Sequence, residues 1–166
     1  DSLRGLVQLQ GRRVATSLNG ALDSLEQVGA SARERLAATV DETNRLAARV
    51  AALNGQIQTA EVGGGTAGDL RDARDLLLDD LARRAGAGVL ERPDGTLAVV
   101  VAGATVVDGT TARELEVRSS GGTLAVGLRG IGPALGGIGG DAAAALEVHD
   151  AEVPRVPDAL RRLGAA

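Results

Sequence analysis

The sequence predicts an α+β protein: an elongated helical bundle of three helices plus a returning C-terminal helix, with a small antiparallel β lobe inserted into it. Three observations predict this fold. Apolar residues recur at helical spacing from Leu3 to Leu81, alternate between about 88 and 129, and return to helical spacing from Ala143 to Leu163. We therefore expect a helical domain at 1–87, a β lobe with a glycine-rich connector at 88–138, and a returning helix at 139–166 that completes the helical domain.

The first predicted helix covers 3–28, and a second begins near Ser31. Gly29-Ala30-Ser31 predicts a break or kink, because Ser31 is a favourable N-cap and Glu34 completes a capping box. Each helix carries an apolar stripe, and Thr43 fills a gap in the second one. We expect the second stripe to pack against 3–28 and 146–163. The stripes consist of Leu3, Val7, Val14, Leu18, Leu22 and Leu25, and of Leu36, Val40, Leu46, Val50, Leu53 and Ile57.

Gly63-Gly64-Gly65 ends the second helix, because consecutive glycines lose too much backbone entropy to stay helical. Thr66 and Asp69 offer a capping box for a third helix, which Gly86 or Gly88 terminates. Its expected buried face consists of Leu70, Ala73, Leu77 and Leu81.

Four or five short antiparallel strands are expected between 88 and 129. Pro93-Asp94-Gly95-Thr96 predicts a tight turn between two of them, and Ser119-Ser120-Gly121-Gly122 predicts another hairpin. Residues 130–140 form a glycine-dense connector. In the returning helix, Pro154 and Pro157 each remove a backbone donor and should kink or split it.

Composition limits the possible functions. The chain has no Phe, Tyr, Trp, Cys, Met or Lys, so it offers no aromatic side chain for base stacking, no disulfide and no thiolate metal ligand. Its net charge of −4 and its short arginine pairs argue against nucleic acid and an anionic membrane surface as partners. No apolar run approaches the ~20 residues that span a bilayer. The helical pattern from the first residues onward predicts a piece of a longer protein.

No residue emerges as catalytic, cofactor-binding or metal-binding, and we expect no enzyme and no cofactor. The single histidine, His149, is interpreted as a solvated or boundary helix residue, and a phosphoacceptor role lacks any companion motif. Gly63–Gly68 lacks the lysine of a phosphate loop and follows a helix, and Pro133 interrupts the other glycine cluster. The acidic residues of the third helix alternate with arginines, which predicts ion pairs such as Arg71 with Asp75 on a solvated face. They are Asp69, Asp72, Asp75, Asp79 and Asp80, interleaved with Arg71, Arg74, Arg83 and Arg84.

Four segments carry a family resemblance. The helix 38–57 contains Val40, Asn44, Leu53-Asn54 and Ile57, and the third helix reads Asp69-Leu70-Arg71-Asp72-Ala73-Arg74-Asp75-Leu76-Leu77-Leu78-Asp79-Asp80-Leu81. A strand-and-turn run ends in Val106-Val107-Asp108-Gly109, and the return begins at Gly139-Gly140-Asp141. In this order and spacing the chain resembles bacterial flagellar hook-associated protein 1. It departs from that family's usual pattern at Thr43, Ala73, 141–144 and His149, and it resembles a central fragment without the two terminal assembly segments.

The resemblance implies a structural subunit of the bacterial flagellum, exported through the flagellar secretion apparatus, that forms a junction ring between hook and filament. It implies contacts with the hook protein, the second junction protein and neighbouring copies of itself, and an extracellular place in the flagellum. The fragment is expected to be monomeric in isolation, with its β lobe facing outward from the tube.

Two alternatives belong to other classes. A coiled-coil signalling or chemoreceptor-like segment would form a parallel helical dimer with heptads running through 88–129, which the alternating pattern there opposes. A small ligand-binding α+β domain would show a ligand-dependent shift in melting temperature.

Overall fold

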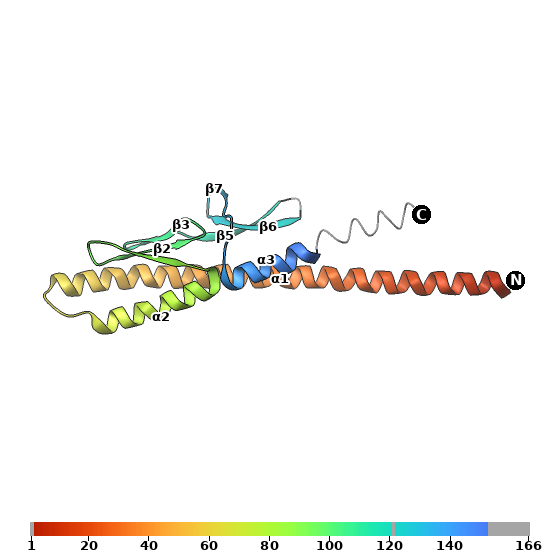
Figure 1. The fold of residues 1–166 in the computed structure, drawn as a ribbon, viewed down its shortest axis with the longest axis horizontal. Coiled ribbons are helices and arrows are strands. Elements are labelled where there is room, and N and C mark those ends of the chain that lie inside the picture. Colours follow the sequence, from red (N-terminus) through yellow and green to blue (C-terminus); the bar gives the residue numbers. More distant parts are fainter. Residues whose placement is uncertain (1, 121, 153–166) are drawn as a thin grey trace.

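The computed structural model describes residues 2–120 and 122–152, and it shows a rod with a β layer along part of one side (Figure 1). Helix α1 (Ser2–Val62) runs the length of the molecule. Helix α2 (Gly68–Ala85) folds back along one end of α1, and α3 (Gly140–Glu152) lies along its middle. The strands form a second layer over these helices, so the predicted α+β fold is confirmed.

The predicted break at Gly29-Ala30-Ser31 is wrong, because α1 is continuous through it. Ser31 is exposed inside the helix and forms no N-cap. The physical reason is the packing of α3, whose neighbours on α1 run from Val28 to Thr39 and so span the expected break. Glycine in a helix costs only about 1 kcal/mol relative to alanine, a penalty that packing offsets. The bundle therefore has three described helices rather than four, and 3–28 cannot fold back on 36–57.

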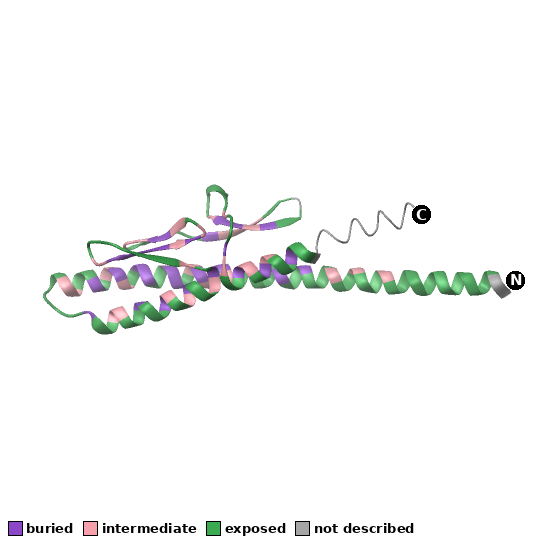
Figure 2. Cartoon of the chain, viewed as in Figure 1, coloured by how far each residue is buried: buried purple, intermediate pink, exposed green. Residues whose placement is uncertain are grey.

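The second half of α1 buries the stripe that the sequence predicts. Figure 2 shows buried residues following one face of the helix where α2, α3 and the strands cover it. Thr43 is buried among them, and its hydroxyl donates to the carbonyl of Thr39 at 2.7 Å. Each fully buried leucine or isoleucine contributes roughly 1.5–3 kcal/mol. The buried stripe includes Leu36, Val40, Leu46, Val50 and Ile57, with Leu53 partly buried.

Helix α2 is rotated relative to its predicted orientation. Its buried residues are Arg74, Leu77, Leu81 and Ala85, whereas Leu70 is only half-buried and Ala73 is exposed. The Thr66–Asp69 capping box does not form, because Ala67 occupies the N-cap position without a side-chain cap. Gly86 ends the helix as predicted: it has a φ of 65°, and its N–H donates to the carbonyl of Ala82.

The β layer contains two antiparallel sheets. The first has the order β1-β2-β3-β4, formed by β1 (Gly88–Glu91), β2 (Leu97–Val101), β3 (Ala104–Asp108) and β4 (Thr111–Ala112). The second has the order β5-β6-β7, formed by β5 (Leu115–Ser120), β6 (Thr123–Leu128) and β7 (Ile131–Ala134).

The predicted turn at 93–96 separates β1 from β2, with Val89 paired to Val99. The sequence expectation of four or five strands is corrected to seven. It missed the two-residue β4 and also β7, which lies inside the predicted glycine connector. Glycine and proline in β7 hide its strand character, and pairing of Leu128 with Ile131 defines it.

Glycines allow the chain to return closely past the end of α2. Gly139 donates to the carbonyl of Ala85, and a Cβ built on Gly86 would lie 2.8 Å from the Gly139 Cα. Gly140 has a φ of 63° and faces the backbone of Arg83 with no room for a side chain. Helix α3 starts there, three residues before the predicted Ala143. The predicted kinks at Pro154 and Pro157 lie outside the described residues.

Candidate functional site

His149 lies in the interior of the structure, not at the surface as the sequence predicted. Its side chain is 1% exposed, which corrects the interpretation as a solvated or boundary residue. Its Nδ1 lies 3.4 Å from Oδ1 of the adjacent Asp150. His149 shares the buried face of α3 with Ala142 and Ala145. The position is therefore part of the α1–α3 packing.

The aspartates of α2 lie on its outer side, as the sequence predicts for a solvated face, but their ion pairs differ. Arg71 binds Glu61 of α1 rather than Asp75, with two hydrogen bonds of 2.6 and 3.0 Å to Glu61 Oε1. That hydrogen bond raises the pKa of Arg71. Arg83 pairs with Asp80. Among residues 2–120 and 122–152, no group of three or more acidic or histidine side chains converges as a metal site.

The glycine loop between α1 and α2 serves as a helix cap. The N–H groups of Gly63, Gly64 and Gly65 donate to the carbonyls of Thr59, Glu61 and Ala60 at 3.0–3.2 Å. A phosphate loop presents such groups to its ligand, whereas these are already used. The second glycine cluster contains β7 and so lacks the strand-loop-helix order of a dinucleotide site.

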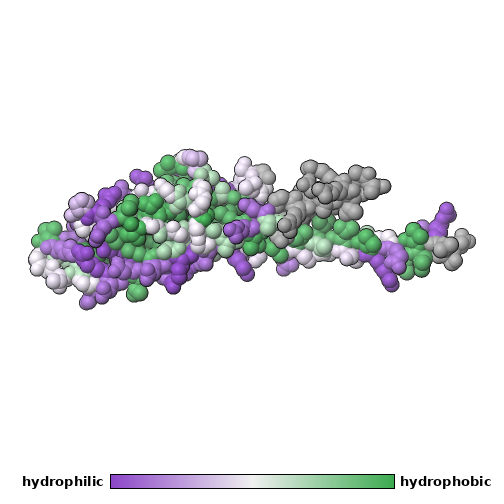
Figure 3. Space-filling view, in the orientation of Figure 1, coloured by the Kyte–Doolittle hydropathy of each residue, from purple (hydrophilic) through white to green (hydrophobic). Residues whose placement is uncertain are grey.

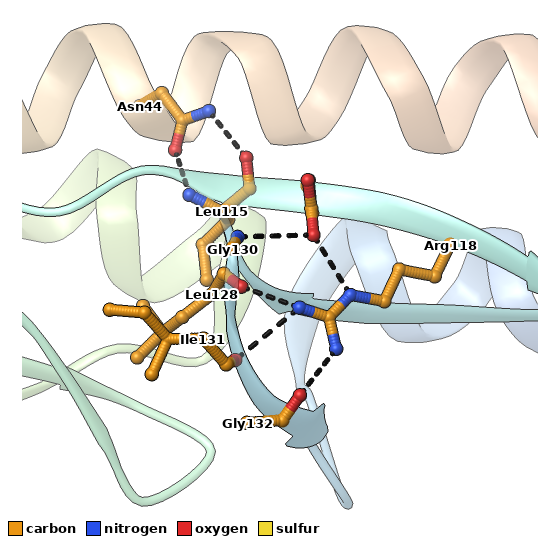
Figure 4. Close-up of polar contacts among 8 residues, drawn as sticks. Asn44, Leu115, Arg118, Leu128, Gly130, Ile131 and Gly132 are labelled. Carbon is orange, nitrogen blue, oxygen red and sulfur yellow. Dashed lines mark hydrogen bonds and ion pairs between the residues drawn. The ribbon is translucent and has the colours of Figure 1, made fainter.

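Two asparagines of α1 join the helix layer to the β layer. Asn44 Nδ2 donates to the carbonyl of Leu115 at 2.9 Å, and Asn44 Oδ1 accepts from the Leu115 N–H at 2.8 Å (Figure 4). The side-chain amide thus pairs with the first residue of β5 as a neighbouring strand would. Because both groups of Leu115 are satisfied, β5 can rest directly on the helix.

Asn54 performs the same role for the first sheet and is fully buried. Its Nδ2 donates to the carbonyls of Leu97 and Gly109 at 2.9 and 2.7 Å. Its Oδ1 accepts from Arg74 at 3.0 Å and from the Leu97 N–H at 3.4 Å. One amide therefore links α1, α2 and both ends of the β2–β3 hairpin.

Arg74 is the charged member of this cluster and is only 3% exposed, which corrects its placement on the solvated face. Burial lowers the pKa of its guanidinium, because desolvation disfavours the charged form. Its Nε has no hydrogen-bond partner in the structure. Sequence reasoning missed Asn44, Asn54 and Arg74 as connectors, although asparagines next to an apolar stripe are a usable signal for buried amides.

Arg118 organises the second sheet in a similar way. Its guanidinium donates to the carbonyls of Leu128 and Gly132 at 2.7 Å and of Ile131 at 3.3 Å, and its Nε donates to Glu116 Oε1 (Figure 4). The hydrogen bond from Arg118 lowers the pKa of Glu116. The absence of a side chain at Gly127 lets the guanidinium cross the sheet. Arg118 therefore fixes the β6–β7 turn.

Exposed apolar residues recur along the first half of α1, called here the α1 arm (residues 4–28). Figure 3 shows hydrophobic residues exposed along this projecting part. Leu6 and Val7 are 58% and 69% exposed, and Leu9 and Val14 are similarly open. The arm leads into a groove of about 590 Å³ between α1 and α3, whose charged lining residues are Arg35 and Asp141. Its other lining residues are Val28, Ser31, Ala32, Ala38, Thr39, Ala144, Ala145 and Val148.

Residues 1–166 match the family model described as the flagellar hook-associated protein FlgK helical domain. The chain belongs to this family. A curated relative, flagellar hook-associated protein 1 of Bacillus subtilis (strain 168), is 30% identical over 110 residues, which are 61% of this chain and 22% of the relative.

A solved structure, the flagellar hook junction protein FlgK from Burkholderia pseudomallei, superposes with a TM-score of 0.67 and 25% identity. The matched region covers 81% of this chain and 26% of the Burkholderia pseudomallei chain. The chain therefore spans about a quarter of these FlgK relatives. The resemblance in the sequence is thus confirmed, and the seven strands between Gly88 and Ala134 contradict the coiled-coil alternative.

The residues that join the layers fall within the segments that carry this FlgK resemblance. Asn44 and Asn54 come from the helix segment, Arg74 from the acidic helix, and Gly139-Gly140 from the return. In the FlgK helical domain of this chain these residues hold layers together, whereas the α1 arm carries exposed apolar residues that no other described element covers. Within the described residues no helix is long and apolar enough to cross a membrane.

Proposed function

We propose that this chain is the helical domain of a structural subunit that joins hook to filament in the bacterial flagellum. Membership of the FlgK family supports a flagellar role. The observation that carries an assembly role is the α1 arm. Three glycines weaken this helix by about 1 kcal/mol each, and helices in proteins gain most of their stability from packing, so the arm needs partners along its apolar stripe.

The whole subunit acts, in this proposal, without catalysis and outside the cell, after export by the flagellar secretion apparatus. Its partners are the hook protein, the second junction protein and neighbouring copies of itself. The helical body comprises 1–87 and 139–166, and the lobe at 88–138 faces outward from the tube. The hydrogen bonds from Asn44 and Asn54 to the strands support a rigid attachment of that lobe to the helices.

Deletion of the full-length gene tests the role. We expect cells that keep hooks, lose attached filaments and release filament protein into the medium. Complementation tests the arm: L6D together with V7D should fail, because charges would enter a packed apolar interface. Q8D is the control, since Gln8 is also exposed but polar, so a charge there replaces no apolar side chain and should be tolerated.

Intact, normally attached filaments in the deletion strain would refute the junction role. Full complementation by L6D/V7D, with normal protein levels, would refute the arm as the assembly surface while leaving the junction role standing.

A further inference from the structure

Two asparagines of α1 are each followed by glycine, the neighbour that least hinders attack of a backbone nitrogen on the asparagine side chain. The pairs are Asn19-Gly20 in the α1 arm and Asn54-Gly55 under the first sheet. Their settings within the helix match, because each glycine carbonyl accepts a hydrogen bond of 2.8 Å from the hydroxyl of the residue four positions later. Any difference in their reactivity therefore comes from tertiary packing.

The reaction expected at such a pair is deamidation through a cyclic imide. The glycine backbone nitrogen gives up its proton to hydroxide and forms a bond to the asparagine Cγ. The Cγ–Nδ2 bond then breaks, and the side-chain nitrogen leaves as ammonia. Water opens the imide at either carbonyl and yields aspartate or isoaspartate, each with a negative charge where asparagine is neutral. Glycine favours ring closure because it carries no side chain and its backbone rotates freely.

An intact α-helix opposes this reaction at both pairs. The helix holds the glycine N–H in a hydrogen bond to a carbonyl of the preceding turn. It also keeps the asparagine backbone at helical dihedral angles, whereas ring closure requires a more extended backbone. The reaction therefore proceeds through local opening of the helix, and its rate follows the free energy of that opening.

The Asn54 pair can open only when the two layers separate. Asn54 is fully buried, and its amide forms hydrogen bonds with the first sheet and with Arg74. Gly55 is packed as well, since a Cβ built on it would lie 3.4 Å from Thr110 Cγ2. Extending the backbone here breaks these contacts together, so opening of this pair requires nearly global unfolding.

The Asn19 pair lacks this packing. Asn19 and Gly20 are both exposed, and a Cβ built on Gly20 would meet no atom within 4 Å. Figure 2 shows the first half of α1, which contains the pair, exposed along most of its length. Each glycine weakens this helix by about 1 kcal/mol relative to alanine. Opening of the arm therefore costs less free energy than separation of the layers.

We propose that Asn19 is a site of spontaneous deamidation in the native chain, whereas tertiary packing keeps the chemically matched Asn54 unreacted until the protein unfolds. Isoaspartate, one of the two products, routes the backbone through the side-chain methylene and so adds an atom to the main chain. The hydrogen-bond ladder of the helix cannot continue in register through that atom, and the arm is permanently broken there. This site is independent of the junction role proposed above.

Mass spectrometry of the 166-residue chain tests the proposal, because trypsin separates the two pairs into peptides 14–33 and 50–71. In the native chain, incubated in mildly alkaline buffer, peptide 14–33 should deamidate at least tenfold faster than peptide 50–71. In guanidinium chloride the two rates should agree within about twofold, because packing no longer distinguishes them. Comparable rates in the native chain would overturn the proposal. A native chain that stays unmodified at Asn19 while the denatured chain reacts would overturn it as well.

Two alanine variants test the chemical route. G20A should slow the reaction of peptide 14–33 at least tenfold even in guanidinium chloride, because the added methyl group obstructs attack by the backbone nitrogen. G11A is the matched control: Gly11 is an equally open position of the same helix, and its replacement should leave the denatured rate unchanged. An undiminished rate in G20A would overturn the cyclic imide as the route.

Amide exchange tests the consequence for the arm. The deamidated chain should exchange residues 14–28 faster than N19D, which has the same charge but a main chain of normal length. Residues 36–57 should exchange equally in both. Equal exchange of 14–28 in the two proteins would overturn the break in the arm.

Discussion

At the residue scale, two asparagine side chains decide how the β layer sits on the helices. A primary amide carries a donor and an acceptor side by side, the same pattern that a strand edge offers, so it can pair with the N–H and carbonyl of one residue. Asn44 does this for Leu115, and Asn54 does it for Leu97 while also reaching Gly109 and Arg74.

Replacing Asn54 by alanine should lower the free energy of unfolding by about 3 kcal/mol, because several buried polar groups lose their partner at once. Q58A is the matched control: Gln58 is an exposed amide on the same helix, and its loss should cost under about 0.5 kcal/mol. Urea denaturation of both variants checks this. A loss below about 1 kcal/mol for N54A would show that water replaces the amide.

The β2–β3 hairpin contains a strained residue. Ala102 has a φ of 48° and is followed by Gly103 at 81°, the positive-φ pair of a two-residue hairpin turn. Alanine in this conformation costs about 1 kcal/mol, whereas asparagine tolerates it. We expect A102N to raise the melting temperature and A102V to lower it, and calorimetry of the two variants measures both shifts. A stabilising A102V would contradict the strain.

Acid should weaken the second sheet through Glu116. Its folded pKa is lowered by the hydrogen bond from Arg118, so its contribution to stability is present above the unfolded value of about 4.3 and is lost as pH falls through the folded value. Melting temperatures measured between pH 6 and about 3 should therefore drop less steeply for E116Q than for the parent chain. Parallel curves would show that this pair contributes nothing.

At the element scale, the junction of α2 with α3 depends on glycines that have no room for side chains. Gly140→Ala combines a positive φ with overlap against the Arg83 backbone, so it should destabilise by more than about 2 kcal/mol. Gly136→Ala is the control, because a Cβ there meets nothing within 4 Å. Chemical denaturation compares the two variants. Equal free energies of unfolding would mean that the α2–α3 junction accommodates a methyl group without losing stability.

The glycines of the α1 arm differ from those at the α2–α3 junction, because each has open space where a side chain would lie. A Cβ at Gly20 contacts no other atom within 4 Å, and alanine there should stabilise the helix by about 1 kcal/mol. We expect slower amide exchange in the arm of G20A with unchanged exchange in 36–57. Slower exchange throughout the chain would show that the arm and the core unfold as one unit.

Much of the element structure could be predicted from sequence, because local signals govern it. The glycine run at 63–65, the αL cap at Gly86 and the turn at 93–96 act within a few residues. The break at Ser31 was predicted wrongly, since its capping signal is local but α3 packs across it from more than 100 residues away. Strand β7 was missed because only its partner β6 defines it.

At the scale of the whole molecule, the continuous α1 makes the chain a rod. Its 61 residues rise about 1.5 Å each, so the maximum dimension in solution should approach 90 Å. A compact chain of this size would have a radius of gyration of only about 15 Å. Small-angle scattering distinguishes the two shapes, and a maximum dimension near half the expected value would mean that 3–28 folds back after all.

The sequence alone determined the class of this protein. Apolar period, glycine positions and ordered motifs report local backbone preference, and they were enough to indicate helices around a β lobe and membership of the FlgK family. Only the tertiary structure decided which polar residues are buried. Asn54, Arg74 and His149 look like surface residues in the chain, and they became connectors or core because elements distant in sequence close over them. Such burial depends on packing between layers, which no short window of sequence contains.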